Sequence, residues 1–315
     1  MLVEAFCNLG HLRTVRIQSI GYPHYYGDLS DAVIGDDDAQ WSQTIVRISN
    51  ASCVQNVLYA LAKSGTKPRQ LEIDFTDLCL SDDAFNLPSF MEKAVSPVLA
   101  SLETIYLRFS HVQELVMVYS NEQKQIHKIR SYYMRKFLLR APQIKHLNLL
   151  DVDGHRDDFF AWLSGQASSE QYDGPRELEP PISPTFTNLY ELMLVSVYIH
   201  TNDLLAIIRK FSATMRQLHL YGTTFIMPSS NGWLGFIAQL ARVSRHLEEV
   251  TLERIGLDVD NQNNVRIRFP EFSYAGNNME EVLGGLVHVT GIDGKLNMRV
   301  SRQLSVANFT RHERK

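Results

Sequence analysis

One short apolar pattern recurs along most of this chain and constrains its fold more than any other feature. It consists of an apolar residue, two variable residues, a second apolar residue, one variable residue and a third apolar residue. The copies begin at residues 12, 68, 102, 144, 189, 215 and 247, with Pro68 in the leading position of the second copy. Seven copies with similar flanks indicate an internal repeat.

Each copy is expected to form a short strand. Apolar and variable residues alternate within it, as in Leu147-Asn148-Leu149, and this period of two is typical of a strand with one buried face. Apolar residues at helical spacing precede most copies, such as Val54, Leu58 and Leu61. Thr201-Asn202-Asp203 offers side chains that could cap a helix. Each unit therefore predicts a helix, a tight turn, a strand and a loop.

A single unit of this kind cannot bury its apolar face, whereas stacked units bury it against one another. We therefore expect an α/β fold, a solenoid or horseshoe with a parallel sheet on its concave face and helices on its convex face. The helix before the third copy is expected to start at Leu87-Pro88. Its expected buried face is made of Phe90, Ala94, Val95 and Leu99.

The opening of each unit resembles that of the leucine-rich-repeat family, and the resemblance covers about residues 2–255. The Asn or Cys that usually follows the strand is missing from most copies, and the units are long and irregular. In these respects, and in the stretches 58–65 and 68–73, the chain is similar to the divergent repeats of fungal F-box/leucine-rich-repeat proteins. The resemblance implies substrate recognition for an SCF-type ubiquitin ligase, if an F-box is supplied upstream.

The F-box itself, which docks onto a Skp-type adaptor, is not visible in the sequence. Leu87-Pro88 is the nearest match to its opening but lacks the acidic residue. Leu2, Val3 and Phe6 resemble the last turn of a repeat helix, so the array is expected to start within a unit. Two explanations are open: the gene model is truncated, or a partner covers that end of the array. The alternative function is a stand-alone repeat scaffold or regulator with no ligase link.

The expected organisation is an irregular repeat array over residues 1–255 and a degenerate final repeat or C-terminal cap over 256–315. Long loops are expected at about 21–44 and 164–188, where Gly, Pro, Ser and Asp gather. Val265 to Phe269 alternates like a strand within the expected cap.

Composition excludes several classes of protein. The net charge is −4 at pH 7, which argues against binding to nucleic acid by bulk charge. No run of about 18 apolar residues and no signal peptide are present, which predicts no membrane partner and a cytoplasmic or nuclear protein. Cys7, Cys53 and Cys79 are odd in number and lack CxxC spacing, so we expect small core residues rather than disulfides or a zinc site.

No residue pattern indicates catalysis, a cofactor or a metal. The acidic stretch from Asp151 to Asp158 lacks the Gly and Glu that a calcium loop needs, and is expected to be a solvated loop. The phosphate-binding, dinucleotide-binding, GxSxG and HExxH motifs are all missing. We therefore expect a non-catalytic interaction module.

The segment 124–145 contains seven Lys or Arg residues and no acid: Lys124, Lys128, Arg130, Arg135, Lys136, Arg140 and Lys145. One interpretation is a docking surface for RNA, a membrane or an acidic protein patch. The other, favoured by the net negative charge of the chain, is a convex-face helix whose basic side is solvated.

The expected partner-binding residues follow from the alternation. One residue between the inward apolar residues of each strand must face the concave surface. In chain order these are Arg16, Glu72, Tyr106, Asn148, Met193, His219 and Thr251. Their outward neighbours include Asp74, Arg108, Tyr221 and Glu253. Tyr and Arg are frequent interface anchors, so Tyr106, Arg108 and Tyr221 are the expected hot spots for a protein partner, unless they are merely solvated strand residues.

Overall fold

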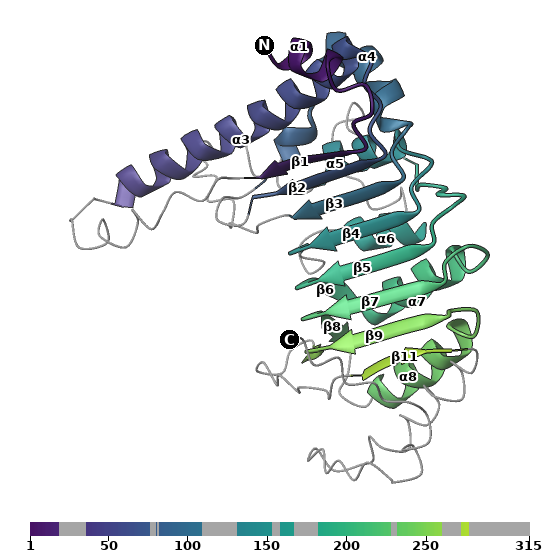
Figure 1. The fold of residues 1–315 in the computed structure, drawn as a ribbon. Helices are drawn as coiled ribbons and strands as arrows, with labels where there is room; N and C mark the ends of the chain where they lie inside the picture. The colour runs from purple at the N-terminus through teal and green to yellow at the C-terminus, as the bar shows by residue number, and fades with distance from the viewer. Residues whose placement is uncertain are drawn as a thin grey trace, which may run out of the picture.

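The protein has an α/β fold built on a mostly parallel sheet (Figure 1). A computed structural model describes residues 1–18, 36–75, 80, 82–108, 131–152, 158–166, 182–227, 232–259 and 272–276. Every copy of the apolar pattern lies within these ranges, so the predicted strands can all be compared with the structure.

Each of the seven copies forms one strand of a single sheet, in chain order and parallel to its neighbours. The strands are β1 (Thr14–Gln18), β2 (Gln70–Asp74), β3 (Thr104–Arg108), β4 (His146–Leu150), β5 (Glu191–Val195), β7 (Gln217–Tyr221) and β9 (Glu249–Glu253). An eighth strand, β11 (Phe272–Ala275), pairs antiparallel with β9. The predicted parallel sheet is confirmed.

The strands are in register, so equivalent apolar residues form two continuous columns through the core. The first column pairs Leu71, Ile105, Leu147, Leu192, Leu218 and Val250, and the second pairs Ile73, Leu107, Leu149, Leu194, Leu220 and Leu252. All of these side chains are buried. The register therefore places every predicted core residue of the strands on one face of the sheet.

A recurring backbone hydrogen bond joins each unit to the next just before the strand. The N–H of Lys145 donates to the carbonyl of Glu103 at 2.7 Å, and the N–H of Tyr190 donates to the carbonyl of Lys145 at 2.8 Å. The N–H of Arg216 donates to the carbonyl of Tyr190 at 2.8 Å, and the N–H of Glu248 donates to the carbonyl of Arg216 at 2.7 Å. The units therefore stay in step although they differ in length.

The residue after four of the strands has a left-handed backbone, with φ of 60° at Asp151, 52° at Ser196, 60° at Gly222 and 53° at Arg254. Glycine adopts this conformation without strain, and Asp tolerates it better than most residues. After three of these turns the chain enters a second, parallel sheet of β6 (Tyr198–His200), β8 (Thr224–Met227) and β10 (Gly256–Val259). The turn thus directs the chain away from the first sheet at the same point of successive units.

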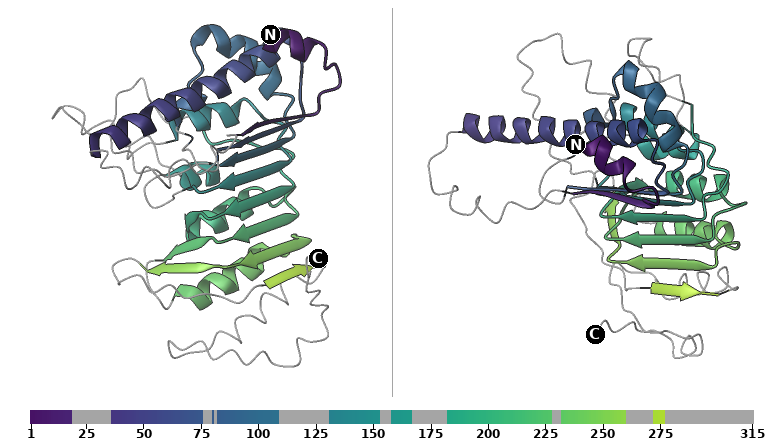
Figure 2. Two further views of the ribbon diagram at one scale, coloured as in Figure 1. Left: turned by 60° about the vertical axis from the view of Figure 1, so that its left-hand side comes forward. Right: turned by 45° about the horizontal axis from the view of Figure 1, so that its top comes forward.

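The helices complete the core on one side of the eight-stranded sheet (Figures 1 and 2). They are α1 (Leu2–Cys7), α3 (Asp36–Ser64), the 3-10 helix η1 (Asp82–Phe85), α4 (Ser89–Leu99), α5 (Tyr132–Leu139), α6 (Phe159–Ser164), α7 (Thr201–Lys210) and α8 (Gly232–Val243). Buried side chains such as Leu58, Phe137, Ile207 and Leu240 belong to the same core as the strand columns. The start of α4 after Pro88 is as predicted.

The helix α3 corrects one expectation about the loops. It begins at Asp36, so the expected loop over 21–44 contains the start of a helix. No Gly or Pro lies between Asp36 and Ser64, so nothing in the sequence interrupts the helix there. Residues 19–35 and most of the expected loop at 164–188 lie outside the described residues, as do Val265–Phe269 of the expected cap.

Three local predictions are wrong. Phe90 is 66% exposed and packs edge-on against Tyr59, with ring centroids 5.9 Å apart, because it lies on the outer side of α4. The helix α7 begins at Thr201 after His200, and no side chain caps it by a hydrogen bond. Cys7 and Cys53 are free and exposed rather than buried, because they lie on the outer sides of α1 and α3, and Cys79 lies outside the described residues.

In its described part, the segment 124–145 contradicts the expected solvated basic side at Arg135, whereas Lys136 and Arg140 are partly exposed and Lys145 is exposed. Arg135 is buried, forms an ion pair with Asp158 and lies over the ring of Trp162. Arg140 Nη2 lies 2.8 Å from Glu92. Lys145 Nζ lies 3.0 Å from Glu103. Acidic residues from other units neutralise these cations, and the sequence alone does not show that pairing; residues 124–130 lie outside the described ranges.

Leu192→Ala tests the core columns. Leu192 is buried between Leu147 and Leu218, so the cavity is expected to lower the free energy of unfolding by about 2–5 kcal/mol. Phe90→Ala is the control, with an expected change of about 1 kcal/mol or less, because that aromatic side chain is largely exposed. Urea unfolding measures both, and equal losses in the two variants would contradict the assignment of the core.

Candidate protein-binding face

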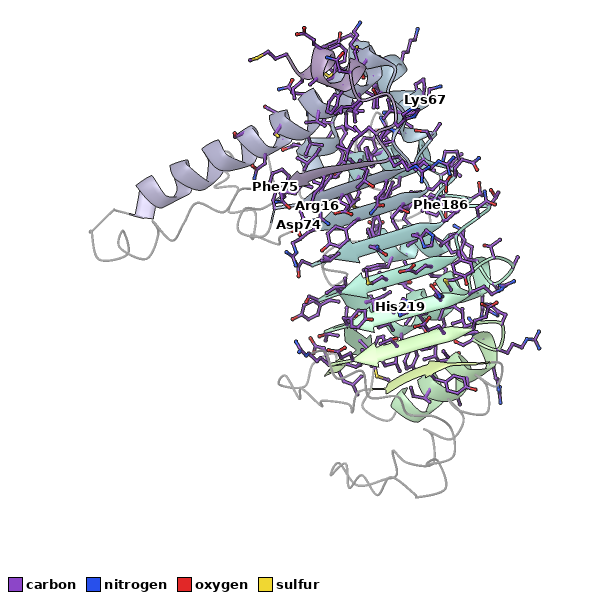
Figure 3. All side chains as sticks on the ribbon, in the orientation of Figure 1. Arg16, Lys67, Asp74, Phe75, Phe186 and His219 are labelled. Carbon is purple, nitrogen blue, oxygen red and sulfur yellow. The ribbon has the colours of Figure 1, made fainter. Side chains whose placement is uncertain are left out.

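The outward side chains of β1, β2, β3, β4, β5, β7 and β9 form the face of the sheet turned away from the helices, called here the open face (Figure 1). No described helix covers it. The register aligns its side chains in three rows, one residue from each strand in every row. In Figure 3, Arg16, Asp74 and His219 mark this face at β1, β2 and β7.

The middle row contains the seven residues that the alternation predicted. They pair in register as Arg16, Glu72, Tyr106, Asn148, Met193, His219 and Thr251. Their predicted common placement is confirmed, although Thr251 is buried while the others are exposed or partly exposed. Whether they bind a partner stays a prediction.

Two further rows flank the middle row. The first contains Thr14, Gln70, Thr104, His146, Glu191, Gln217 and Glu249, and the third contains Gln18, Asp74, Arg108, Leu150, Val195, Tyr221 and Glu253. The predicted anchors Arg108 and Tyr221 belong to the third row. Leu150, Val195, Glu191 and Glu249 were not predicted for this face, although the same period of two places Leu150 and Val195 two residues after the middle row and Glu191 and Glu249 two residues before it.

At the β1 end of the open face, the outward Arg side chains form ion pairs with neighbouring carboxylates. The Arg16 guanidinium forms an ion pair with Glu72. Arg108 lies between two acids, with Nη1 3.0 Å from Asp74 and Nε 3.2 Å from Asp151. These pairs connect adjacent strands, and they leave no unpaired Arg or Lys among the outward side chains of β1, β2 and β3.

The cluster around Arg108 keeps an excess of negative charge, because one guanidinium serves two carboxylates. Burial raises the pKa of Asp151 from its ordinary value; the Arg108 charge opposes this shift and the Asp74 charge adds to it. Burial also raises the pKa of the Tyr106 hydroxyl, again with a contribution from Asp74. The cluster is therefore a place where an additional cation would be stabilised.

The centre of the open face is apolar and aromatic. Leu150 is buried, whereas Met193, Val195 and Tyr221 are partly exposed. The ring of His219 stacks on that of Tyr221 with centroids 6.3 Å apart and an interplanar angle of 12°. Met and Tyr are enriched in protein interfaces, since one adapts its shape and the other supplies a rigid, amphipathic ring. This part of the sheet is therefore suited to bury part of a partner.

The outward side chains from β5 to β9 include three carboxylates, Glu191 on β5 and Glu249 and Glu253 on β9. Glu191 Oε2 lies 2.8 Å from His146 Nδ1, and Glu249 Oε2 accepts a hydrogen bond from the Gln217 amide at 3.1 Å. Glu253 lies 3.6 Å from Arg254, whose side chain is 79% exposed. The outward side chains of β5, β7 and β9 include no Lys or Arg. The open face is therefore acidic at its β9 end.

The described residues contain no group of three or more His, Cys, Asp or Glu side chains that could hold a metal ion. Asp151, from the acidic stretch considered above, contacts Arg108 instead, and residues 153–157 lie outside the described ranges.

Among the described helices, none is long and apolar enough to cross a membrane.

Comparisons with protein-family models, with curated proteins and with solved structures find no match.

The turn residue Asp151 gives a test with a defined pH dependence. Asp151→Ala is expected to lower the free energy of unfolding by about 1 kcal/mol, because a φ of 60° is strained for Ala, whereas Asn tolerates it. The folded protein holds the Asp151 proton more tightly than the unfolded chain, because the folded pKa is raised from 3.8. The stability that this group contributes is therefore present below the unfolded pKa and lost as the pH rises through the folded value.

Asp151→Asn has no proton to lose at this position. Its stability relative to the wild type should therefore rise as the pH increases from below about 4 toward neutrality. Urea unfolding of both proteins over this pH range measures the difference. A difference that stays flat, or that falls with increasing pH, would show that burial does not destabilise the charged form of Asp151.

Proposed function

We propose that this chain is a leucine-rich-repeat solenoid that binds another protein through its open face. The strand order follows the chain order, and the same backbone bond and the same left-handed turn recur in successive units. Such units contact mainly their neighbours, as in repeat proteins generally. The L-x-x-L-x-L pattern that opens each unit supports this assignment of the repeat class.

The observation that carries the proposal is the composition of the open face. Its centre is apolar and aromatic at Met193, Val195 and Tyr221, and ionic and polar pairs surround this centre. Interfaces between proteins have this organisation, with a desolvated centre and a polar rim. A partner that covered the face would bury the centre while the rim stayed in contact with water.

Tyr106→Ala combined with Tyr221→Ala tests the binding face. Both side chains point outward from the sheet, so the fold should persist while binding of protein partners falls at least tenfold. The measurement is quantitative mass spectrometry of proteins that co-purify with the tagged chain from its native cell, and thermal unfolding checks the fold. Phe90→Ala, which removes an exposed aromatic on the helix side, should leave the partners unchanged. If the double variant keeps both its partners and its fold, the open face is not the binding site.

For the biological role, we propose substrate recognition for an SCF-type ubiquitin ligase if an F-box is supplied upstream; the alternative is a stand-alone scaffold or regulator without a ligase link. The support is the similarity of the repeats to those of fungal F-box/leucine-rich-repeat proteins. A carboxyl-terminal tag at the native locus separates the two roles. Recovery of a Skp-type adaptor and a cullin is the expected result, and a reproducible partner set without them would favour the scaffold.

A further inference from the structure

The apolar part of the third row lies between two carboxylates, Asp151, which follows the row's β4 residue, and Glu253, the row's β9 residue. From β4 to β9 the side chains run from Leu150, with Asp151 directly after it, through Val195 and Tyr221 to Glu253. Adjacent strands of a sheet lie about 4.8 Å apart, so the three steps from β4 to β9 span about 14 Å. Two negative positions at the ends of this span therefore enclose the partly exposed apolar side chains.

Both negative positions can accept a further cation. Asp151 shares Arg108 with Asp74, so two carboxylates face one guanidinium. Among the described residues, the Glu253 carboxylate pairs with Arg254 at 3.6 Å; the Arg254 side chain is largely in solvent, and such exposed pairs contribute little. The side chains of Asp151 and Glu253 are 37% and 34% exposed, so an incoming group can reach them.

The charge of this surface selects between partners. An acidic segment would meet the carboxylates of Glu249 and Glu253 with no outward Lys or Arg on β5, β7 or β9 to offset them. A basic segment would gain attraction at both ends and would be steered toward the face. The apolar centre adds a requirement for an aliphatic or aromatic side chain between the two cations.

We infer that the segment occupying the open face is an extended basic peptide of a protein partner, with Lys or Arg at positions i and i+4 and an apolar residue at i+2. This inference rests on the proposed function, because it names the chemistry of the partner at the same face. An extended chain rises about 3.3 Å per residue, so four residues cover about 13 Å, which matches the span between Asp151 and Glu253. Residues i, i+2 and i+4 of an extended chain point to the same side, so all three side chains meet the sheet together.

In this arrangement position i lies over β4, and position i+2 lies about 6.6 Å further along the peptide. The strands β5 and β7 lie about 5 and 10 Å from β4, so the side chain at i+2 lies between Val195 on β5 and Tyr221 on β7. The cation at position i lies near Asp74 and Asp151, and the cation at i+4 lies near Glu253. These ion pairs between the peptide cations and the carboxylates lie at the rim of the interface. They therefore affect the rate of association and its salt dependence more than the final affinity.

A displayed library of random twelve-residue peptides, selected on the full chain, tests the inference. Selected peptides should be enriched in Lys or Arg two residues before and two residues after an apolar residue. Their affinity, measured by fluorescence polarisation with synthetic peptides, should fall as salt is raised. The variant Asp151→Asn with Glu253→Gln should bind about tenfold more weakly and with a flatter salt dependence. Glu4→Gln on α1, an exposed acid away from the open face, is the matched control and should bind as the wild type does.

The failure of this inference differs from the failure of the proposed function. One outcome would overturn the inference and leave the binding face in place. In it, the selected peptides lack basic residues and bind the Asp151→Asn, Glu253→Gln variant as they bind the wild type. The same peptides do not bind the Tyr106→Ala, Tyr221→Ala variant. Peptides that bind both double variants as well as the wild type would overturn the binding face itself. A selection that yields no peptide above the background of the Tyr variant would also overturn the inference.

Discussion

The burial of each unit's apolar strand residues by the adjacent units is the interaction on which the rest of the structure depends. A strand such as β4 has only two inward side chains, Leu147 and Leu149, and these become part of a core because Ile105 and Leu107 lie beside them on β3 and Leu192 and Leu194 on β5. The backbone bond from each unit to the preceding one keeps this register while the rest of the unit varies in length. Irregular loops are therefore compatible with a regular sheet.

The same register creates the proposed binding surface. Once the inward columns are aligned, the outward residues must align as well, because successive side chains of a strand alternate between the two faces. Residues from units far apart in sequence then meet across the open face, as Arg108 meets Asp74 and Asp151. The binding properties that we propose thus arise from stacking: a single unit contributes only three side chains to the face, and the apolar centre exists only where β4, β5 and β7 are adjacent.

The strands and the middle row of the open face could be predicted from the sequence, because a period of two fixes which side of the sheet a residue faces, as at Tyr106 and His219. The ion pairs could not be predicted, since they depend on which units become neighbours. Arg135 was expected on a solvated basic side, but in the folded protein it forms an ion pair with Asp158. Helical spacing also misplaced Phe90, because a periodic pattern does not show where a neighbouring unit ends. The acidic run at Asp36 looked like a loop for a similar reason, because charge alone does not separate an exposed loop from an exposed helix.

Site-specific photo-crosslinking tests the central claim, that the open face binds a protein, most directly. A photoreactive phenylalanine analogue is introduced at Met193 in the centre of the open face and, in a separate variant, at Phe90 on the helix side. After irradiation in the native cell, we expect discrete protein adducts from position 193 and none from position 90. Adducts formed from position 90 and not from position 193 would contradict the claim, because the partner would then lie on the helix side of the sheet.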